Sequence, residues 1–310
     1  MDIVGVGLNA TDTLIPVPRY PASGSKVEFH SASVLPGGQV ASAMVACQRW
    51  GLSARYIGKL GEDAAADLHR SEFLAAGVDA KLVTAPGCPS QQAFILVEDS
   101  GERTVLWKRD GRLTLQPGDL RREWITDARA LHLDGHDTEA AITAATWANE
   151  AGIPVIADLD ELYPGVERLL GKVDYLIVSR DIPGRLAGCS DLRQSLPAVR
   201  ERFRCRLTAA TLGPDGVLAF DGERFCYRPA YQVQVVDTTG AGDIFHAGFI
   251  YGLLQSWPLE RTLDFACAAA ALNCTGVGAR GGIQPVERVE ALMAPGTRYA
   301  PHLDPTGNPL

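Results

Sequence analysis

Residues 237–243 read Asp237-Thr238-Thr239-Gly240-Ala241-Gly242-Asp243, between an apolar segment that ends at Val236 and a helical pattern that begins near Ala241. Two glycines within three residues allow successive backbone N–H groups to converge on one point. The free N–H groups and the positive dipole end of the following helix would face that same point. The stretch therefore predicts a strand-to-helix turn that binds an anion, with a carboxylate beside it.

An acid on the first turn of that helix has the geometry that phosphoryl transfer requires. The turn amides would hold a γ-phosphate, and Asp243 would accept the proton of the attacking hydroxyl. An aspartate near a helix N-terminus is also a common cap, and glycine turns between strands and helices are common. The turn alone leaves both interpretations open.

Segments with strand and helix patterns alternate along most of the chain. Helices are expected at 37–50, 63–76, 138–151, 192–203, 241–255, 259–273 and 286–293. Strands are expected at 3–8, 26–35, 54–57, 92–97, 104–107, 130–133, 155–157, 175–178, 207–211, 217–220 and 224–227. Strands separated by helices of this length predict right-handed crossovers and a mostly parallel sheet.

Two strand segments, 26–35 and 92–107, lack covering helices. They would form a small sheet that projects from the main one, either as a lid over a substrate site or as an ordinary edge hairpin.

Composition excludes several classes of partner. The 310 residues are 46% hydrophobic and 21% charged, which fits a soluble globular protein. A net charge of −8 without a dense basic run argues against nucleic acid and anionic membrane as partners. Seven cysteines without a Cys-x-x-Cys pair indicate a reducing compartment. No apolar stretch approaches the ~20 residues of a membrane helix, so we expect a cytoplasmic protein.

Three other motifs do not hold. Gly5 to Ala10 fits a relaxed dinucleotide pattern, but the prolines that follow exclude the helix which that motif needs. Gly165 to Lys172 resembles a P-loop with the wrong spacing. His132 and His136 flank Asp134, but no further ligand pair supports a metal site, and the metal ligands of this chain stay unassigned.

The string 237–243, followed by Ile244-Phe245-His246-Ala247-Gly248, resembles the C-terminal signature of the ribokinase-like (PfkB) carbohydrate kinases. Pro36-Gly37-Gly38 before an alanine-rich helix resembles the family's first signature. The segments 58–63 and 75–78 resemble its continuation, so the resemblance extends from Asp12 to about Pro285. It implies a three-layer α/β/α fold with a mostly parallel central sheet and a small projecting β-lid. It also implies one kinase domain over 1–310, a lid formed by about 13–35 and 88–108, and a loosely held tail at 295–310.

The resemblance implies a role for each matching residue. The catalytic set is Asp243 as the base, with Gly240, Ala241 and Gly242 as the anion hole. The substrate-binding set is Asp12, Gly37, Gly38, Gln39, Ser42 and Asp243. The nucleotide-binding set is Thr211, Gly213 and Gly216 of a T-x-G-x-x-G motif, with Asn273 and Gly278. The implied cofactors are ATP and Mg²⁺, with K⁺ as a candidate monovalent cation near 278–282, and the implied partners are a small sugar and a second copy bound through the lid.

Two departures bear on the substrate. Ser42 stands where the family usually has a sugar-binding Asn, and Ser179-Arg180-Asp181-Ile182 replaces its Asn-x-x-Glu motif. The latter stretch resembles the ketohexokinase branch, and residues 271–274 resemble sulfofructose kinase. We therefore expect a kinase for a ketose or furanose sugar. The alternatives are a nucleoside kinase, with Trp107 and Phe94 as the wall for a base, and a non-catalytic sensor of sugar or nucleotide.

Overall fold

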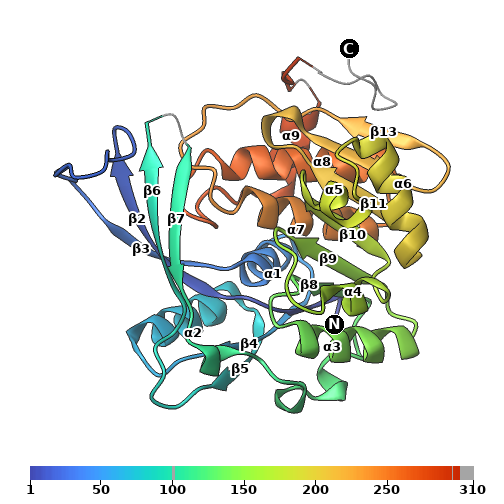
Figure 1. The fold of residues 1–310 in the computed structure, drawn as a ribbon, viewed down its shortest axis with the longest axis horizontal. Helices are drawn as coiled ribbons and strands as arrows, with labels where there is room; N and C mark the ends of the chain where they lie inside the picture. The colour runs from blue at the N-terminus through green and yellow to red at the C-terminus, as the bar shows by residue number, and fades with distance from the viewer. Residues whose placement is uncertain (100–101, 295, 301–310) are drawn as a thin grey trace.

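A nine-stranded sheet forms the centre of the molecule in a computed structural model that describes residues 1–99, 102–294 and 296–300 (Figure 1). Its spatial order is β13-β12-β11-β10-β9-β8-β1-β4-β5. Its strands are β1 (Ile3–Val6), β4 (Ala54–Leu60), β5 (Asp79–Thr84), β8 (Ala130–Leu133), β9 (Val155–Leu159), β10 (Tyr175–Ser179), β11 (Leu207–Thr211), β12 (Val217–Phe220) and β13 (Phe225–Arg228). Within the described part of this sheet, β11 with β12 and β12 with β13 are the antiparallel pairs, and the other pairs are parallel.

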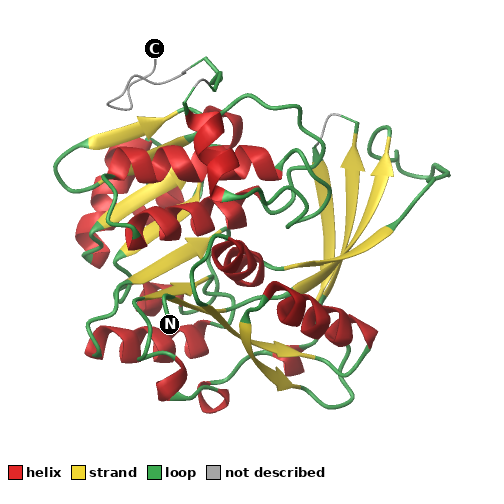
Figure 2. Cartoon of the chain, turned by 180° about the vertical axis from the view of Figure 1, so that it is seen from behind, coloured by secondary structure: helices red, strands yellow, loops and turns green. Residues whose placement is uncertain are grey.

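Helices cover both faces of this sheet (Figure 2). One core lies under α1 (Gln39–Arg49), α2 (Ala64–Ala76), α7 (Ala241–Leu254), α8 (Leu259–Asn273) and α9 (Val286–Met293). The opposite core lies under α3 (Thr138–Glu150), α4 (Val166–Leu170), α5 (Ile182–Ala187) and α6 (Leu192–Phe203). Because both faces are buried, central strands such as β1 and β8 are apolar without alternation. The predicted three-layer α/β/α fold with a mostly parallel sheet is confirmed.

The strand order changes direction beside β1. From β1 the chain builds β4 and β5 on one side, and β8 to β11 on the other. The carboxyl ends of β1 and β8 therefore diverge into connections that leave in opposite directions, which is where open α/β sheets form their ligand crevices.

A second sheet of four strands projects from the first, at the left of Figure 1. Its order is β3-β2-β6-β7, from β2 (Ala10–Val17), β3 (Ser33–Gly37), β6 (Gln92–Glu98) and β7 (Arg103–Lys108). We call these four strands the lid sheet. The register aligns Leu35, Asp12, Ala93 and Trp107 in one row. The next row consists of Val34, Thr13, Phe94 and Leu106. Adjacent rows face opposite sides of a sheet, so the Asp12 row and the Phe94 row point in opposite directions.

The strand prediction for residues 26–35 is wrong in its bounds, since the strand runs from Ser33 to Gly37. The sequence reading also missed β2 and β5. Prolines hid β2, although Pro16 lies beyond the residues that pair with β3, and Pro36 lies in the edge strand β3. Missing N–H groups are tolerated at such positions.

The predicted tail at 295–310 falls partly outside the described residues, at 295 and 301–310. In the described part, Tyr299 N–H donates to the Ala230 carbonyl, and Arg298 pairs with Asp264 at 2.6 Å. The described helices include none that is both long and apolar enough to cross a membrane.

Candidate active site

The turn at 237–243 leads directly into α7, as the sequence predicts. Gly240 is the N-cap of α7 with φ 75°, and a Cβ there would overlap the Ala279 carbonyl oxygen. Glycine is therefore required at 240 both by conformation and by space. A Cβ on Gly242 would instead project into open space. The first N–H groups of α7 lie at this turn, and a helix N-terminus of this kind can bind an anion.

Two buried polar side chains fix the shape of this turn. Asp237 accepts N–H bonds from Thr239 and Gly278, both at 2.8 Å. Asn273, at the end of α8, donates its amide N–H groups to the Thr239 and Ala279 carbonyls at 3.2 and 3.1 Å. These bonds tie the turn to the loop after α8.

Asn273 is fully buried and holds the loop in shape, and its contact with a nucleotide stays a prediction. Gly278, the other predicted residue of this loop, has φ 81° and packs against the Leu35 side chain of the lid sheet.

Asp243 lies on the first turn of α7 and is half-buried. Burial raises its pKa to about 6, and the neighbouring Asp160 contributes in the same direction. Arg103 and Arg280 act in the opposite direction and favour the ionised form. The carboxylate is therefore a stronger base than an exposed aspartate.

Asp12 approaches from β2 and is almost completely buried. Burial, together with the charge of Asp243, raises its pKa to about 7. A Cβ on Gly37 would overlap the Asp12 carboxylate, and Gly38 has φ 94° at the start of α1. The structure thus brings the predicted substrate residues Asp12, Gly37 and Gly38 together beside Asp243.

Arg280 is a residue of this site that sequence reasoning missed. Its buried guanidinium donates to the Gly37 carbonyl at 2.9 Å and to Ser42 Oγ at 3.2 Å. Burial lowers its pKa to about 10, so it stays charged at neutral pH. It joins the two halves of the site, which are more than 230 residues apart in sequence. Ser42 is fully buried beneath it and accepts its Nε–H, and the sugar contact of Ser42 stays a prediction.

Carboxylates from β8 and β9 line the same edge of the sheet. Asp134 accepts the Leu8 N–H at 2.5 Å across the β1/β8 switch point, and burial raises its pKa to about 7. Asp158 lies 3.3 Å from His246 Nδ1, and burial raises the Asp158 pKa well above its usual range. Burial raises the pKa of Asp160, and the nearby Gln39 side chain lowers it, which places that predicted residue near the end of β9.

The predicted nucleotide motif lies at the end of β11. Thr211 donates its hydroxyl to the Val178 carbonyl at 3.3 Å, while Gly213 and Gly216 have φ 62° and 96°. Arg180, from the segment that replaces Asn-x-x-Glu, pairs with Asp215 of this turn. The motif is a structured turn at the same edge of the sheet as the anion turn.

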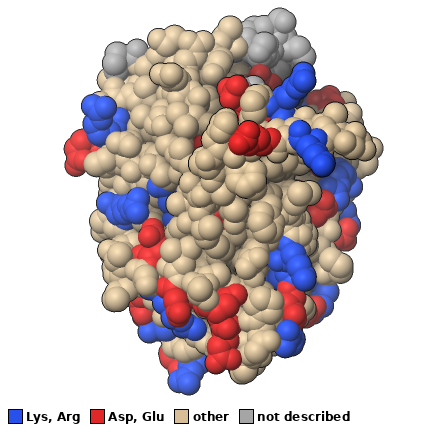
Figure 3. Space-filling model, turned by 90° about the vertical axis from the view of Figure 1, so that its left-hand side faces the viewer, with Lys and Arg blue, Asp and Glu red and all other residues tan. Residues whose placement is uncertain are grey.

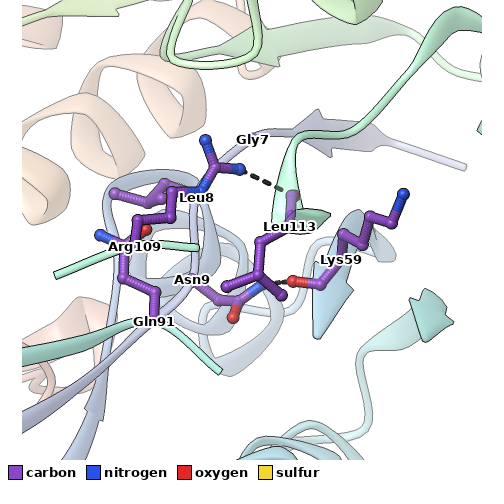
Figure 4. Close-up of a pocket in the computed structure, with 7 residues that line it drawn as sticks. All are labelled: Gly7, Leu8, Asn9, Lys59, Gln91, Arg109 and Leu113. Carbon is purple, nitrogen blue, oxygen red and sulfur yellow. Dashed lines mark hydrogen bonds between the residues drawn. The ribbon is translucent and has the colours of Figure 1, made fainter. Parts of the chain in front are cut away.

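A narrow polar crevice lies where the chain passes between the two sheets (Figure 4). Its lining consists of Gly7, Leu8, Asn9, Lys59, Gln91, Arg109 and Leu113. Arg109 forms a bidentate pair with Asp137 at 2.8 and 2.7 Å and donates to the Leu113 carbonyl. These bonds anchor the chain segment that leaves the lid sheet.

Metal ligation by protein side chains alone finds no support. No group of three or more His, Cys, Asp or Glu in the described ranges could hold a metal ion. His132 stacks on His246 at 5.7 Å, whereas His136 contacts Trp107 and Tyr163. The two histidines therefore belong to different packing clusters.

The phenylalanine proposed as a wall for a base does not reach the site. Phe94 lies in the outward row of the lid sheet and is 48% exposed, between the buried Ala93 and Ile95. Trp107 lies in the opposite row, so of the two aromatic residues only the tryptophan shares a face of the lid sheet with Asp12.

Comparison with known proteins gives consistent matches over nearly the whole chain. The family model of the pfkB family carbohydrate kinases matches residues 2–285. An ATP-dependent ribose-1-phosphate kinase from Halopiger xanaduensis is 31% identical over 87% of this chain and 90% of that protein. An aminoimidazole riboside kinase from Salmonella typhimurium is 30% identical over 84% and 88%. The structure of Arabidopsis thaliana ribokinase complexed with ribose and ATP superposes with a TM-score of 0.80 at 26% identity, over 94% of this chain and 98% of that one.

Removing the Asp237 carboxylate should destabilise the anion turn. We expect Asp237→Ala to lower the free energy of unfolding by about 3 kcal/mol, because two buried N–H groups lose a charged acceptor. Asp237→Asn keeps one acceptor oxygen and should lose about half as much. Denaturant titration followed by circular dichroism measures both, and equal stability of Asp237→Ala and wild type would contradict the assignment.

Proposed function

The chain belongs to the pfkB family of carbohydrate kinases, phosphotransferases with an alcohol acceptor, and we propose that it phosphorylates a hydroxyl of a small ketose or furanose sugar with ATP. One observation carries the proposal. The Asp243 carboxylate stands on the first turn of α7, at the open anion turn, and within electrostatic range of Asp12.

Each part of the turn has a task in this reaction. The sugar oxygen attacks the γ-phosphorus, the bond to the β,γ-bridging oxygen breaks, and ADP leaves with those electrons. Asp243 accepts the hydroxyl proton, and the amides of Gly240, Ala241 and Gly242 hold the oxygens of the phosphoryl group. Asp12 orients the sugar by accepting hydrogen bonds from its hydroxyls, while Gly37 and Gly38 allow the sugar to approach the backbone. Positioning and charge stabilisation supply most of the acceleration in such transfers.

The nucleotide would extend from the anion turn toward Thr211, Gly213 and Gly216 at the end of β11. Mg²⁺ usually binds proteins through one or two carboxylates and the substrate phosphates, and it needs no protein cage. This mode of binding fits this site, which supplies the separate carboxylate of Asp160 beside the phosphoryl position. Mg²⁺ would neutralise phosphate charge there. The backbone carbonyls of the loop 278–282, beside the anion turn, are the candidate site for K⁺.

The acceptor is proposed to be a ketose or furanose, as in the ketohexokinase branch. Gln39 beside Asp160 supports an altered acceptor pocket, whereas Arg180 lies at the nucleotide turn with Asp215. Asp134 adds a further carboxylate near the backbone of Leu8, where sugar hydroxyls could donate.

Asp243 sets the first prediction for activity. We expect Asp243→Asn to lower kcat by about 10²–10⁴-fold on the sugar that the wild type turns over best in a coupled ADP assay. The base acts when ionised, so the wild-type rate should fall about tenfold per pH unit below about pH 6, the pKa of Asp243. Undiminished turnover by the mutant would remove Asp243 from the mechanism. Absence of sugar-dependent ATP consumption in the wild type would instead favour the non-catalytic sensor.

A nucleoside kinase is the second candidate, supported by the similarity to an aminoimidazole riboside kinase and by Trp107 on the inward row. A thermal-shift screen of nucleosides against ketoses and ribose-1-phosphate separates the candidates. We expect the ketoses to raise the melting temperature and Trp107→Ala to leave that shift intact. A nucleoside-specific shift lost in Trp107→Ala would favour the second candidate.

We also propose a cytoplasmic homodimer formed through the lid sheet. Seven free cysteines suit a reducing compartment. On the outward row, Val34, Phe94 and Leu106 are 58%, 48% and 56% exposed, and Figure 3 shows few charges across that face. Sedimentation should give twice the mass of one chain, and Phe94→Glu should halve it. A monomeric wild type would contradict the proposal.

A further inference from the structure

Arg103 is the residue at which the lid sheet contacts the anion turn by a hydrogen bond. It begins β7, the lid strand nearest to the helices in Figure 1. Its guanidinium Nη1 donates to Thr238 Oγ1 at 2.8 Å, across 135 residues of sequence. Arg103 shares its side of β7 with Trp107, which contacts His136. The inward side of β7 therefore touches the main body at both of its ends.

The charges around Asp243 come from several elements. Arg103 from β7 and Arg280 from the loop after α8 favour its ionised form, while Asp160, after β9, opposes it. The charge of Asp243 raises the pKa of Asp12 on β2 and that of Asp158 on β9. His246, one turn further along α7, is kept neutral because burial lowers its pKa to about 4.

Two other arginines near the site, Arg280 and Arg109, already have hydrogen-bond partners in the protein. Arg280 is buried and bonded to Gly37 and Ser42, and Arg109 forms its bidentate pair with Asp137. Arg103 is exposed, and the described residues place no carboxylate within ion-pair distance of it. Its hydrogen bond to Thr238 uses one of its five N–H donors, on a neutral hydroxyl. A planar guanidinium with donors left over is suited to an oxyanion with several oxygens.

We propose that Arg103 is a catalytic residue supplied by the lid, and that its guanidinium binds the γ-phosphoryl group of ATP beside the anion turn. Thr238 holds the guanidinium beside the turn, so the positive charge arrives only when the lid sheet lies over the site. Closure of the lid and completion of the phosphate site are then one event. This inference rests on the proposed ATP-dependent reaction.

The chemistry requires such a charge. Negative charge is spread over the γ-phosphoryl oxygens during transfer, and an arginine placed against them contributes strongly in other phosphoryl transfers. Neutral amides of the turn face a region rich in carboxylates, which repel the same oxygens. Arg103 offsets that repulsion and also keeps Asp243 ionised to accept the proton.

The experiment compares Arg103→Met and Arg103→Lys with Lys108→Met in the full chain. Lys108 lies on the same strand but on its outward side, so it is a matched control for a change in the lid. We measure kcat and KM on the sugar that the wild type turns over, the pH profile, and the affinities for ATP and ADP by calorimetry without sugar.

We expect Arg103→Met to lower kcat at least 100-fold, with the sugar KM within threefold of wild type. The acid limb of its rate profile should move to higher pH, because Asp243 loses a neighbour that favours ionisation. Its preference for ATP over ADP should fall about tenfold, because the lost contact is to the γ-phosphate. Arg103→Lys should recover part of each effect, and Lys108→Met should match wild type.

Equal losses of ATP and ADP affinity, or an unchanged preference in Arg103→Met, would overturn the proposal. Equal effects of Arg103→Met and Lys108→Met would also overturn it, since they would reflect a general disturbance of the lid. The calorimetry needs no sugar, so it tests the contact of Arg103 with ATP separately from the proposed function. The proposed function fails when the wild type turns over no sugar.

Discussion

The burial of several carboxylates around one point is the constraint on which the rest of the site depends. Asp12, Asp134, Asp158 and Asp243 converge from four segments at the carboxyl edge of the sheet, and burial raises the pKa of each of them. Such a group is unstable unless its members are hydrogen-bonded, neutralised by protons or balanced by cations. The backbone N–H of Leu8 and the guanidinium of Arg280 supply part of that balance. A region held in this state favours ligands that bring hydroxyl donors and cations, which describes a sugar and a metal-bound nucleotide.

Long-range polar contacts, rather than local motifs, hold the two signatures together. Arg280 reaches from the C-terminal loop to the Gly37 carbonyl, so the turn before α1 cannot move independently of the anion turn. Asp237 and Asn273 perform the same task on the other side, with bonds only to backbone groups. These side chains occupy positions beside the reacting groups while contacting protein alone. Motif residues near a site thus divide into those that face the ligand and those that hold the loops, and only burial distinguishes them.

Sequence predicted the parts of the fold that depend on local pattern. Helix α8 begins at Leu259 and ends at Asn273 as expected, and α7 begins at Ala241, because helix period and glycine chemistry are local signals. It could not predict the contact between Arg280 and the buried Ser42, or the bond from the Leu8 N–H to Asp134. These contacts join segments that are far apart in sequence and depend on how the chain is folded. Prolines concealed β2, because proline usually argues against a strand. Pro16 is tolerated here since it lies beyond the residues that pair with β3. Phe94 was misplaced because the face that a strand residue occupies depends on register.

That dependence on register explains how one strand can serve two purposes. Along β7, Arg103 and Trp107 point toward the main body, and Leu106 points away from it with Phe94 and Val34. A slip of one residue between β6 and β7 would bring Leu106 to the site and expose Arg103 on the outer face. Ala93, Ile95 and Val97 fix which face of β6 is buried, because a slip of β6 would move these apolar side chains into solvent, and β7 takes its register from β6. The small core of the lid sheet therefore fixes the position of the guanidinium at the anion turn, although none of its residues contacts the reacting groups.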